Sequence, residues 1–246
     1  MLESGSLSFV LLLALLPALG SLLGMALAEW REPPTWLTGG ALHMAAGIAT
    51  AVAAIELIPR AQERTESWMI ALGVLAGAGA SVLLTKLARM MRGGSGKGGS
   101  EALWGAYTAI AIDLFSDGLM TGGGASVAQD LGVLLAASQV VGNLPGGFAI
   151  TAGFRAGGVE RRKRLFAALT YPLAPVAGAL VGWLVLSDAG DALTGAVLAL
   201  FAGLLLTATI EDMVPEADEP GAPRALSSPA FAGGFVILLL MSAYLG

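Results

Sequence analysis

Eight long apolar runs, separated by short islands of charged residues, constrain this chain more than any other feature of its sequence. Seven of them have about 19 to 24 residues, enough to cross a hydrocarbon core of about 30 Å, and the last has about 16. Lipid tails cannot form hydrogen bonds with the backbone, so each spanning segment must satisfy its own N–H and C=O groups. Because strand-like alternation is absent, we expect these segments to be helices. The prediction is an all-α integral membrane protein with one transmembrane domain (1–246) and eight transmembrane helices at about 7–28, 37–58, 67–89, 102–122, 131–154, 165–186, 192–210 and 229–244.

The composition agrees with a membrane protein. Only 13% of the residues are charged, whereas soluble domains carry about 25%. The leading segment MLESGS has no basic residue, so we interpret the first run as a retained helix rather than a signal peptide. The chain has no cysteine, which restricts candidate metal ligands to oxygen atoms, methionine sulfur and the single histidine, His43.

The distribution of basic residues predicts the orientation. With eight spans, eleven of the thirteen Lys and Arg residues lie on one side of the membrane, and only Arg60 and Arg64 lie on the other. The side rich in Lys and Arg is normally cytoplasmic. We therefore expect a multi-pass protein of the cell (inner) membrane with both termini outside the cytoplasm. The glycine-rich residues 92–100 are predicted to form a flexible cytoplasmic linker.

Two segments of the chain resemble each other in opposite directions across the membrane. Residues 45–61 and 201–217 align with a shift of 156 positions, which places Glu56 on Asp212 and Pro59 on Pro215. Inverted repeats are a recurring plan of transporters, and here they indicate a 3+2+3 arrangement in which spans 4 and 5 form the central pair. Glu56 and Asp212 either place a hydrated charge at a helix end or act at a gate. The candidate gate or entrance residues are His43, Glu56, Glu211 and Asp212. For His43, a hydrogen-bonded structural role competes with a metal contact.

Span 4 carries two aspartates near the middle of the membrane. Asp113 and Asp117 are one helical turn apart on the same face, and Ser116 lies beside them. One charged residue at the bilayer centre costs about 2.5 to 3.5 kcal/mol on an insertion scale. No basic residue lies in the central part of any predicted span. A bound cation or protonation is therefore expected to compensate the two carboxylates.

Span 5 adds further oxygen ligands at the same depth, in the sequence QVVGNLPGGFAI. Asn143 supplies an amide oxygen, and Pro145 frees the carbonyl of Val141 because it has no N–H to donate. Hard divalent cations prefer such oxygen ligands. The alternative is a kink that serves only close helix packing; beside the aspartates of span 4, we favour a helix that lines a cation path.

These motifs resemble those of the ZIP (Zrt-, Irt-like protein) metal transporters, and the chain is identified as a divergent bacterial-type member. The resemblance implies eight spans in a 3+2+3 arrangement, both termini outside, and a dinuclear metal centre between spans 4 and 5. The family's span-4 motif falls on DLFSDG, where Asp113 stands for a histidine and Asp117 for a glutamate. Its span-5 motif falls on GNLPGG, where Asn143 matches a ligand, and its span-6 carboxylate is replaced by Tyr171 in ALTYP.

The departures from the family pattern change the expected metal centre. A histidine, a bridging glutamate and the span-6 glutamate are replaced, so the resemblance implies an all-oxygen, mononuclear site, which suits zinc less than a histidine-containing one. The candidate metal ligands are Asp113, Asp117, Asn143, Ser116 and Tyr171.

The expected function is transport of a divalent metal cation (zinc, iron, manganese or similar) into the cytoplasm by alternating access. We expect no enzyme activity, no catalytic cofactor and no nucleic-acid partner; the partners are the metal ion and the lipid bilayer, and small residues along spans 3 and 8 permit a homodimer. The alternative is a non-transporting sensor or partner subunit that has lost the dinuclear centre. An intramembrane aspartyl protease needs two aspartates facing each other, whereas Asp113 and Asp117 share one helix.

Overall fold

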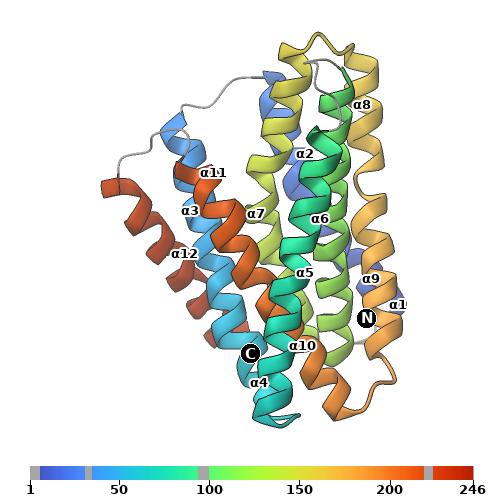
Figure 1. The fold of residues 1–246 in the computed structure, drawn as a ribbon, viewed down its shortest axis with the longest axis vertical. Helices are drawn as coiled ribbons and strands as arrows, with labels where there is room; N and C mark the ends of the chain where they lie inside the picture. Colours follow the sequence, from blue (N-terminus) through green and yellow to red (C-terminus); the bar gives the residue numbers. More distant parts are fainter. Residues whose placement is uncertain (1–5, 31–34, 94–99, 219–223, 246) are drawn as a thin grey trace.

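Long helices run side by side through the computed structural model, which describes all residues except 1–5, 31–34, 94–99, 219–223 and 246 (Figure 1). The described residues contain helices and turns and no strand. The helices are α1 (Leu7–Leu13), α2 (Leu15–Trp30), α3 (Thr35–Ala51), α4 (Ile58–Gln62), α5 (Ser67–Gly93), α6 (Ser100–Val127), α7 (Gln129–Ala156), α8 (Arg161–Thr170), α9 (Leu173–Leu186), α10 (Asp191–Ala208), α11 (Val214–Asp218) and α12 (Arg224–Leu245), with π-helical turns η1 (Val52–Leu57) and η2 (Thr209–Met213). The expected all-helical class is confirmed.

Seven helical stretches in the described part of the chain are long and apolar enough to cross a membrane. They are Leu7–Trp30, Trp36–Gln62, Ser67–Leu87, Gln129–Ala156, Arg161–Leu186, Asp191–Asp218 and Ala225–Tyr244. The sequence predicted eight, and the difference is α6, which has 28 residues but no 18-residue stretch as apolar as those of the other seven. Its two aspartates and three consecutive glycines, 122–124, lower its hydropathy. Most side chains of its second half are buried within the bundle.

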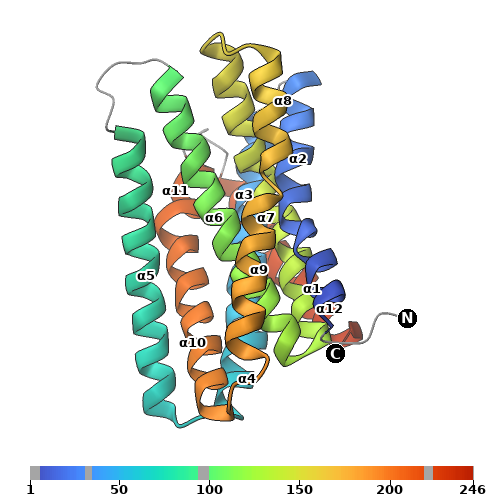
Figure 2. The same cartoon turned by 90° about the vertical axis from the view of Figure 1, so that its right-hand side faces the viewer.

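The two ends of the bundle are distinguished by their connections. One, here called the α4 end, holds the turns between α4 and α5, between α6 and α7, and between α9 and α10; the other, the α8 end, holds the turn between α7 and α8 (Figures 1 and 2). Helix α1 begins and helix α12 ends in the half of the bundle toward α4 (Figures 1 and 2). Residues 94–99 of the predicted linker lie outside the described part of the chain.

Four pairs of helices approach so closely that glycine lies against the backbone of its partner. A Cβ atom on any of these glycines would collide with a backbone carbonyl across the contact, and small residues at such positions let helices pack tightly in membranes. The pairs are α2 with α7 (Gly24, Gly147), α6 with α9 (Gly118, Gly178), α3 with α12 (Gly47, Gly234) and α5 with α10 (Gly77, Gly203).

These pairs combine into two units. Helices α6 and α7 pack on each other and join α1, α2 and α9 into one set, here called the α6–α7 unit. Helix α8 belongs to it through Ala167, which shares an apolar cluster with Leu114 and Phe154. Helix α10 and its continuation contact α3 and α4, and with α5 and α12 they form the second set, the α3–α10 unit. The two units meet along α5 with α6 and along α3 with α7. The interface between the units therefore passes beside α6 and α7.

Both π-helical turns precede a proline. Pro59 and Pro215 have no N–H to donate to the carbonyls of Ile55 and Glu211, which lie inside η1 and η2. A wider turn accommodates such an interruption without ending the helix. The helix runs on into α4 in the first case and α11 in the second.

Neighbouring glycines of α12 offer a matched test of the close packing. We expect Gly234→Ala to lower the free energy of unfolding by about 1–3 kcal/mol, because its Cβ would press on the carbonyl of Met44. Gly233→Ala meets nothing within 4 Å and should be neutral, or stabilising by up to about 1 kcal/mol through helix propensity. Thermal unfolding in detergent compares the two variants. Equal effects would contradict this packing.

Candidate cation site

A cavity of about 580 Å³ lies between the two units. Its walls come from α3, α5, α6, α7 and the continuous helix of α10, η2 and α11, with Ser21 of α2. It extends from Met120 and Leu204 in the inner part of the bundle to Gly153 and Glu216 near the α8 end. Toward the α4 end, the buried side chains of Val52, Leu57, Leu131, Leu134 and Leu198 belong to one apolar cluster. The cavity thus occupies the half of the bundle toward α8.

Asp117 and Asn143 meet in the wall of this cavity. The Asn143 amide donates a hydrogen bond of 2.6 Å to the Asp117 carboxylate and a second, of 3.2 Å, to the carbonyl of Pro17. Asp117 is only 8% exposed. Asn143 therefore fixes a buried carboxylate from α6 against α7 and α2, as the pairing of spans 4 and 5 requires.

Asp113 lines the same cavity one turn nearer the α8 end, and its side chain is exposed there. Ser116 lines the cavity as well, but its hydroxyl donates to the Ile112 carbonyl of its own helix at 3.2 Å. Three of the predicted span-4 residues therefore reach one cavity wall.

Gln139, a buried residue of α7 that is not among the predicted site residues, supports the backbone of Asp117. Gln139 donates to the backbone carbonyl of Asp117 at 3.2 Å and accepts from the Thr121 hydroxyl at 2.7 Å. Gln139 is 6% exposed and Thr121 is fully buried. A signal was present, because Gln139 lies four residues before Asn143 and so shares its face of α7.

The glycines of α7 divide between packing and cavity. A Cβ on Gly147 would collide with the backbone of Ser21, whereas Gly142 and Gly146 line the cavity, and a Cβ on Gly146 would meet nothing within 4 Å. Pro145 lies inside α7, which continues past it to Ala156. In this part of α7, Gly147 therefore fits the alternative of close packing, whereas Gly142 and Gly146 fit that of a cation path.

The electrostatic character of the cavity is strongly acidic. The described residues that line it include no Lys or Arg and five carboxylates, those of Asp113, Asp117, Glu211, Asp212 and Glu216. Charges of one sign in a cleft with low-dielectric walls concentrate counter-ions. The described residues contain no group of three or more His, Cys, Asp or Glu placed to hold one metal ion. A cation here would need amide, hydroxyl, backbone or water oxygens in addition to Asp113 and Asp117.

The other predicted site residues lie elsewhere in the structure. Tyr171 is fully buried in an apolar cluster with Leu114 and Phe154, and its ring centroid lies 4.8 Å from that of Tyr107. Tyr171 is not among the residues that line the cavity. His43 is buried beside Asp218 in a second, smaller cavity.

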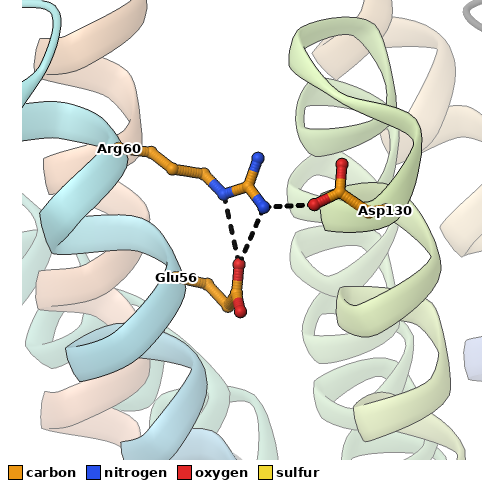
Figure 3. A network of polar contacts seen from close by, with 3 residues as sticks. All are labelled: Glu56, Arg60 and Asp130. Carbon is orange, nitrogen blue, oxygen red and sulfur yellow. Dashed lines mark hydrogen bonds and ion pairs between the residues drawn. The ribbon is translucent and has the colours of Figure 1, made fainter. Parts of the chain in front are cut away.

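The candidate gate carboxylates have different surroundings. Glu211 and Asp212 line the acidic cavity, and Asp212 accepts from Thr85 of α5 at 2.8 Å. Glu56 is buried near the α4 end, where Arg60 donates to it at 2.9 Å and also pairs with Asp130 at the start of α7 (Figure 3). Arg60 thus links the α3–α10 unit to the α6–α7 unit.

The fold and the cavity define a multi-pass helical membrane protein with an acidic interior. No family model matches the chain. The chain is similar to the zinc transporter ZupT of Corynebacterium aurimucosum, with 24% identity over 265 residues, covering 99% of this chain and 100% of that protein. This full-length similarity supports membership of the ZIP family, as the motifs predict.

Proposed function

We propose that this protein transports a divalent metal cation, and that the cation binds between α6 and α7 at Asp113, Asp117 and Asn143. The observation that most supports this proposal is the acidic cavity, whose described lining has five carboxylates and no basic side chain. Buried carboxylates need a compensating positive charge. The similarity to a zinc transporter supports a divalent metal as the cargo.

The contacts around Asp117 fit a weak oxygen site. Asn143 and Gln139 hold Asp117 and its backbone in place from the side of α7, which reduces the reorganisation needed when a cation binds. Asp113, exposed to the cavity, lies one turn nearer the α8 end than Asp117, so a cation from that end would meet it before Asp117. A site with two carboxylates and an amide releases its ion more readily than a closed four-ligand site, as transport requires.

The arrangement of the helices supports eight spans in an inverted 3+2+3 repeat. In this scheme, spans 1 to 3 correspond to spans 6 to 8, and span 4 corresponds to span 5. The contact of α2 with α7 then becomes that of α9 with α6, and the contact of α3 with α12 becomes that of α10 with α5. The turns η1 and η2 also occupy corresponding positions before Pro59 and Pro215.

The basic residues support an orientation with the α8 end in the cytoplasm. Lys86, Arg155 and the run 161–164 lie toward that end, whereas Arg60 and Arg64 lie at the α4 end. By the positive-inside tendency, both termini then face outward. In this orientation the cavity lies on the cytoplasmic side of the apolar cluster, which is the arrangement expected of an inward-facing state.

Alternating access would then move the α6–α7 unit against the α3–α10 unit. Glycine-to-backbone contacts join α2 to α7 and α9 to α6, so spans 1 and 6 move together with spans 5 and 4. The Arg60–Asp130 ion pair crosses between the units, whereas Arg64–Asp191 and Arg164–Glu29 each lie within one unit. The pair formed by Arg60 therefore holds the outer end closed in this state.

Cation uptake into proteoliposomes tests the site. We expect Asp113→Ala to abolish uptake of zinc, manganese or iron, because one of the two carboxylates between α6 and α7 is lost. Asp188→Ala removes an exposed carboxylate in the turn after α9 and should leave uptake unchanged. Wild-type rates in Asp113→Ala would refute the assignment. Specific cation binding without uptake by the wild-type protein would favour the alternative of a non-transporting sensor.

Thiol labelling tests the role of Arg60. The chain has no cysteine, so Val52→Cys places one thiol in the buried apolar cluster, on the α8 side of the ion pair. We expect Arg60→Gln to speed its reaction with a membrane-impermeant maleimide from the α4 side by about threefold to tenfold, the effect of roughly 1 kcal/mol. Arg64→Gln, whose partner Asp191 lies in the same unit, is the control. Equal labelling rates in the two variants would rule out this role.

A further inference from the structure

His43 and Asp218 face each other in a second cavity, of about 370 Å³, which is separate from the acidic cavity. His43 comes from α3 and Asp218 from the last residue of α11. The remaining lining residues are Val214, Ser227, Ser228 and Phe231. The side chain of His43 is 8% exposed, whereas the side chain of Asp218 is 62% exposed.

The hydrogen bonds of His43 determine which of its ring nitrogens carries a proton. Nδ1 lies 2.9 Å from the backbone carbonyl of Gly39, and a carbonyl can only accept, so Nδ1 must donate. In the neutral ring, Nε2 then presents a lone pair to the Asp218 carboxylate, 3.3 Å away. Two acceptors at this distance repel each other unless a proton or another cation lies between them.

The geometry of the two groups matches a pair of metal ligands. Histidines that bind a metal almost always donate their other ring N–H to a carbonyl or carboxylate, which fixes the tautomer and the ring orientation. A nitrogen and an oxygen bound to one tetrahedral zinc ion at ordinary bond lengths lie about 3.4 Å apart. The observed separation between Nε2 and the carboxylate oxygen is 3.3 Å.

We propose that His43 and Asp218 form a second divalent-cation site at the α8 end. The ligands are His43 Nε2 and the Asp218 carboxylate, and water or the serine hydroxyls of the cavity complete the coordination. Imidazole with carboxylate suits zinc and similar borderline cations, unlike the all-oxygen site at Asp113 and Asp117. The exposed carboxylate gives a cation a path from solvent.

The position of this site connects it to the main cavity. Met213, Pro215 and Glu216 line the acidic cavity, whereas Val214 and Asp218 of the same helical segment line the His43 cavity. A cation that leaves the first cavity at its α8 end therefore lies next to the second site. That a transported cation binds at His43 and Asp218 as it leaves the protein rests on the proposed transport function. Cation binding at these two residues does not.

The single histidine of the chain makes the test direct. Full-length protein labelled with ¹⁵N-histidine in nanodiscs gives one pair of ring nitrogen signals, recorded at about pH 8, where free imidazole is neutral. We expect zinc chloride to shift the Nε2 signal to a metal-bound position while Nδ1 stays protonated. Asp218→Asn should weaken this response by roughly tenfold or more.

Two results would overturn the proposal: no change in the histidine signals at millimolar zinc, or an unchanged response in Asp218→Asn. Because Asp218 is exposed, this variant is expected to fold. Asp113→Ala should keep the full histidine response, because its substitution lies in the other cavity. A normal histidine response in a wild-type protein that does not take up cations would refute transport and leave this site intact.

Discussion

The cost of holding carboxylates inside an apolar helical bundle is the constraint on which the rest of this structure depends. Asp117 is almost completely buried and Asp113 lies one turn away on the same helix. The protein limits this cost with Asn143, which bonds the carboxylate of Asp117, and with a cavity beside α6 that admits water or a cation. The low hydropathy of α6 follows from the same residues, and its neighbours α5, α7 and α9 shield it in the bundle.

Close backbone contacts make α6 part of the larger α6–α7 unit. Gly118 and Gly178 join α6 to α9, and Gly24 and Gly147 join α7 to α2. The proposed cation site therefore lies on helices that are tightly packed within their own unit. Across the interface, an ion pair at the α4 end and an acidic cavity toward the α8 end replace these contacts. The asymmetry of this interface fits the inward-facing state proposed above.

The sequence was sufficient to indicate the class of protein and the family that the chain resembles, because apolar length and the DLFSDG and GNLPGG motifs are local signals. The full-length similarity to ZupT confirms the family resemblance. The support of Asp117 by Gln139 was missed because a glutamine in an apolar run does not reveal its partner. The bridge from Arg60 to Asp130 joins residues 70 positions apart, and the structure places Tyr171 in an aromatic cluster away from the cavity. These features depend on how helices pack, which periodicity does not determine.

The central claim is that a divalent cation binds between α6 and α7. The most direct measurement is the anomalous scattering of zinc or manganese in crystals of the wild-type protein grown with that cation. The account predicts an anomalous peak within coordination distance of the carboxylates of Asp113 and Asp117, beside Asn143. A fully occupied peak at His43 and Asp218, with none between α6 and α7, would contradict it.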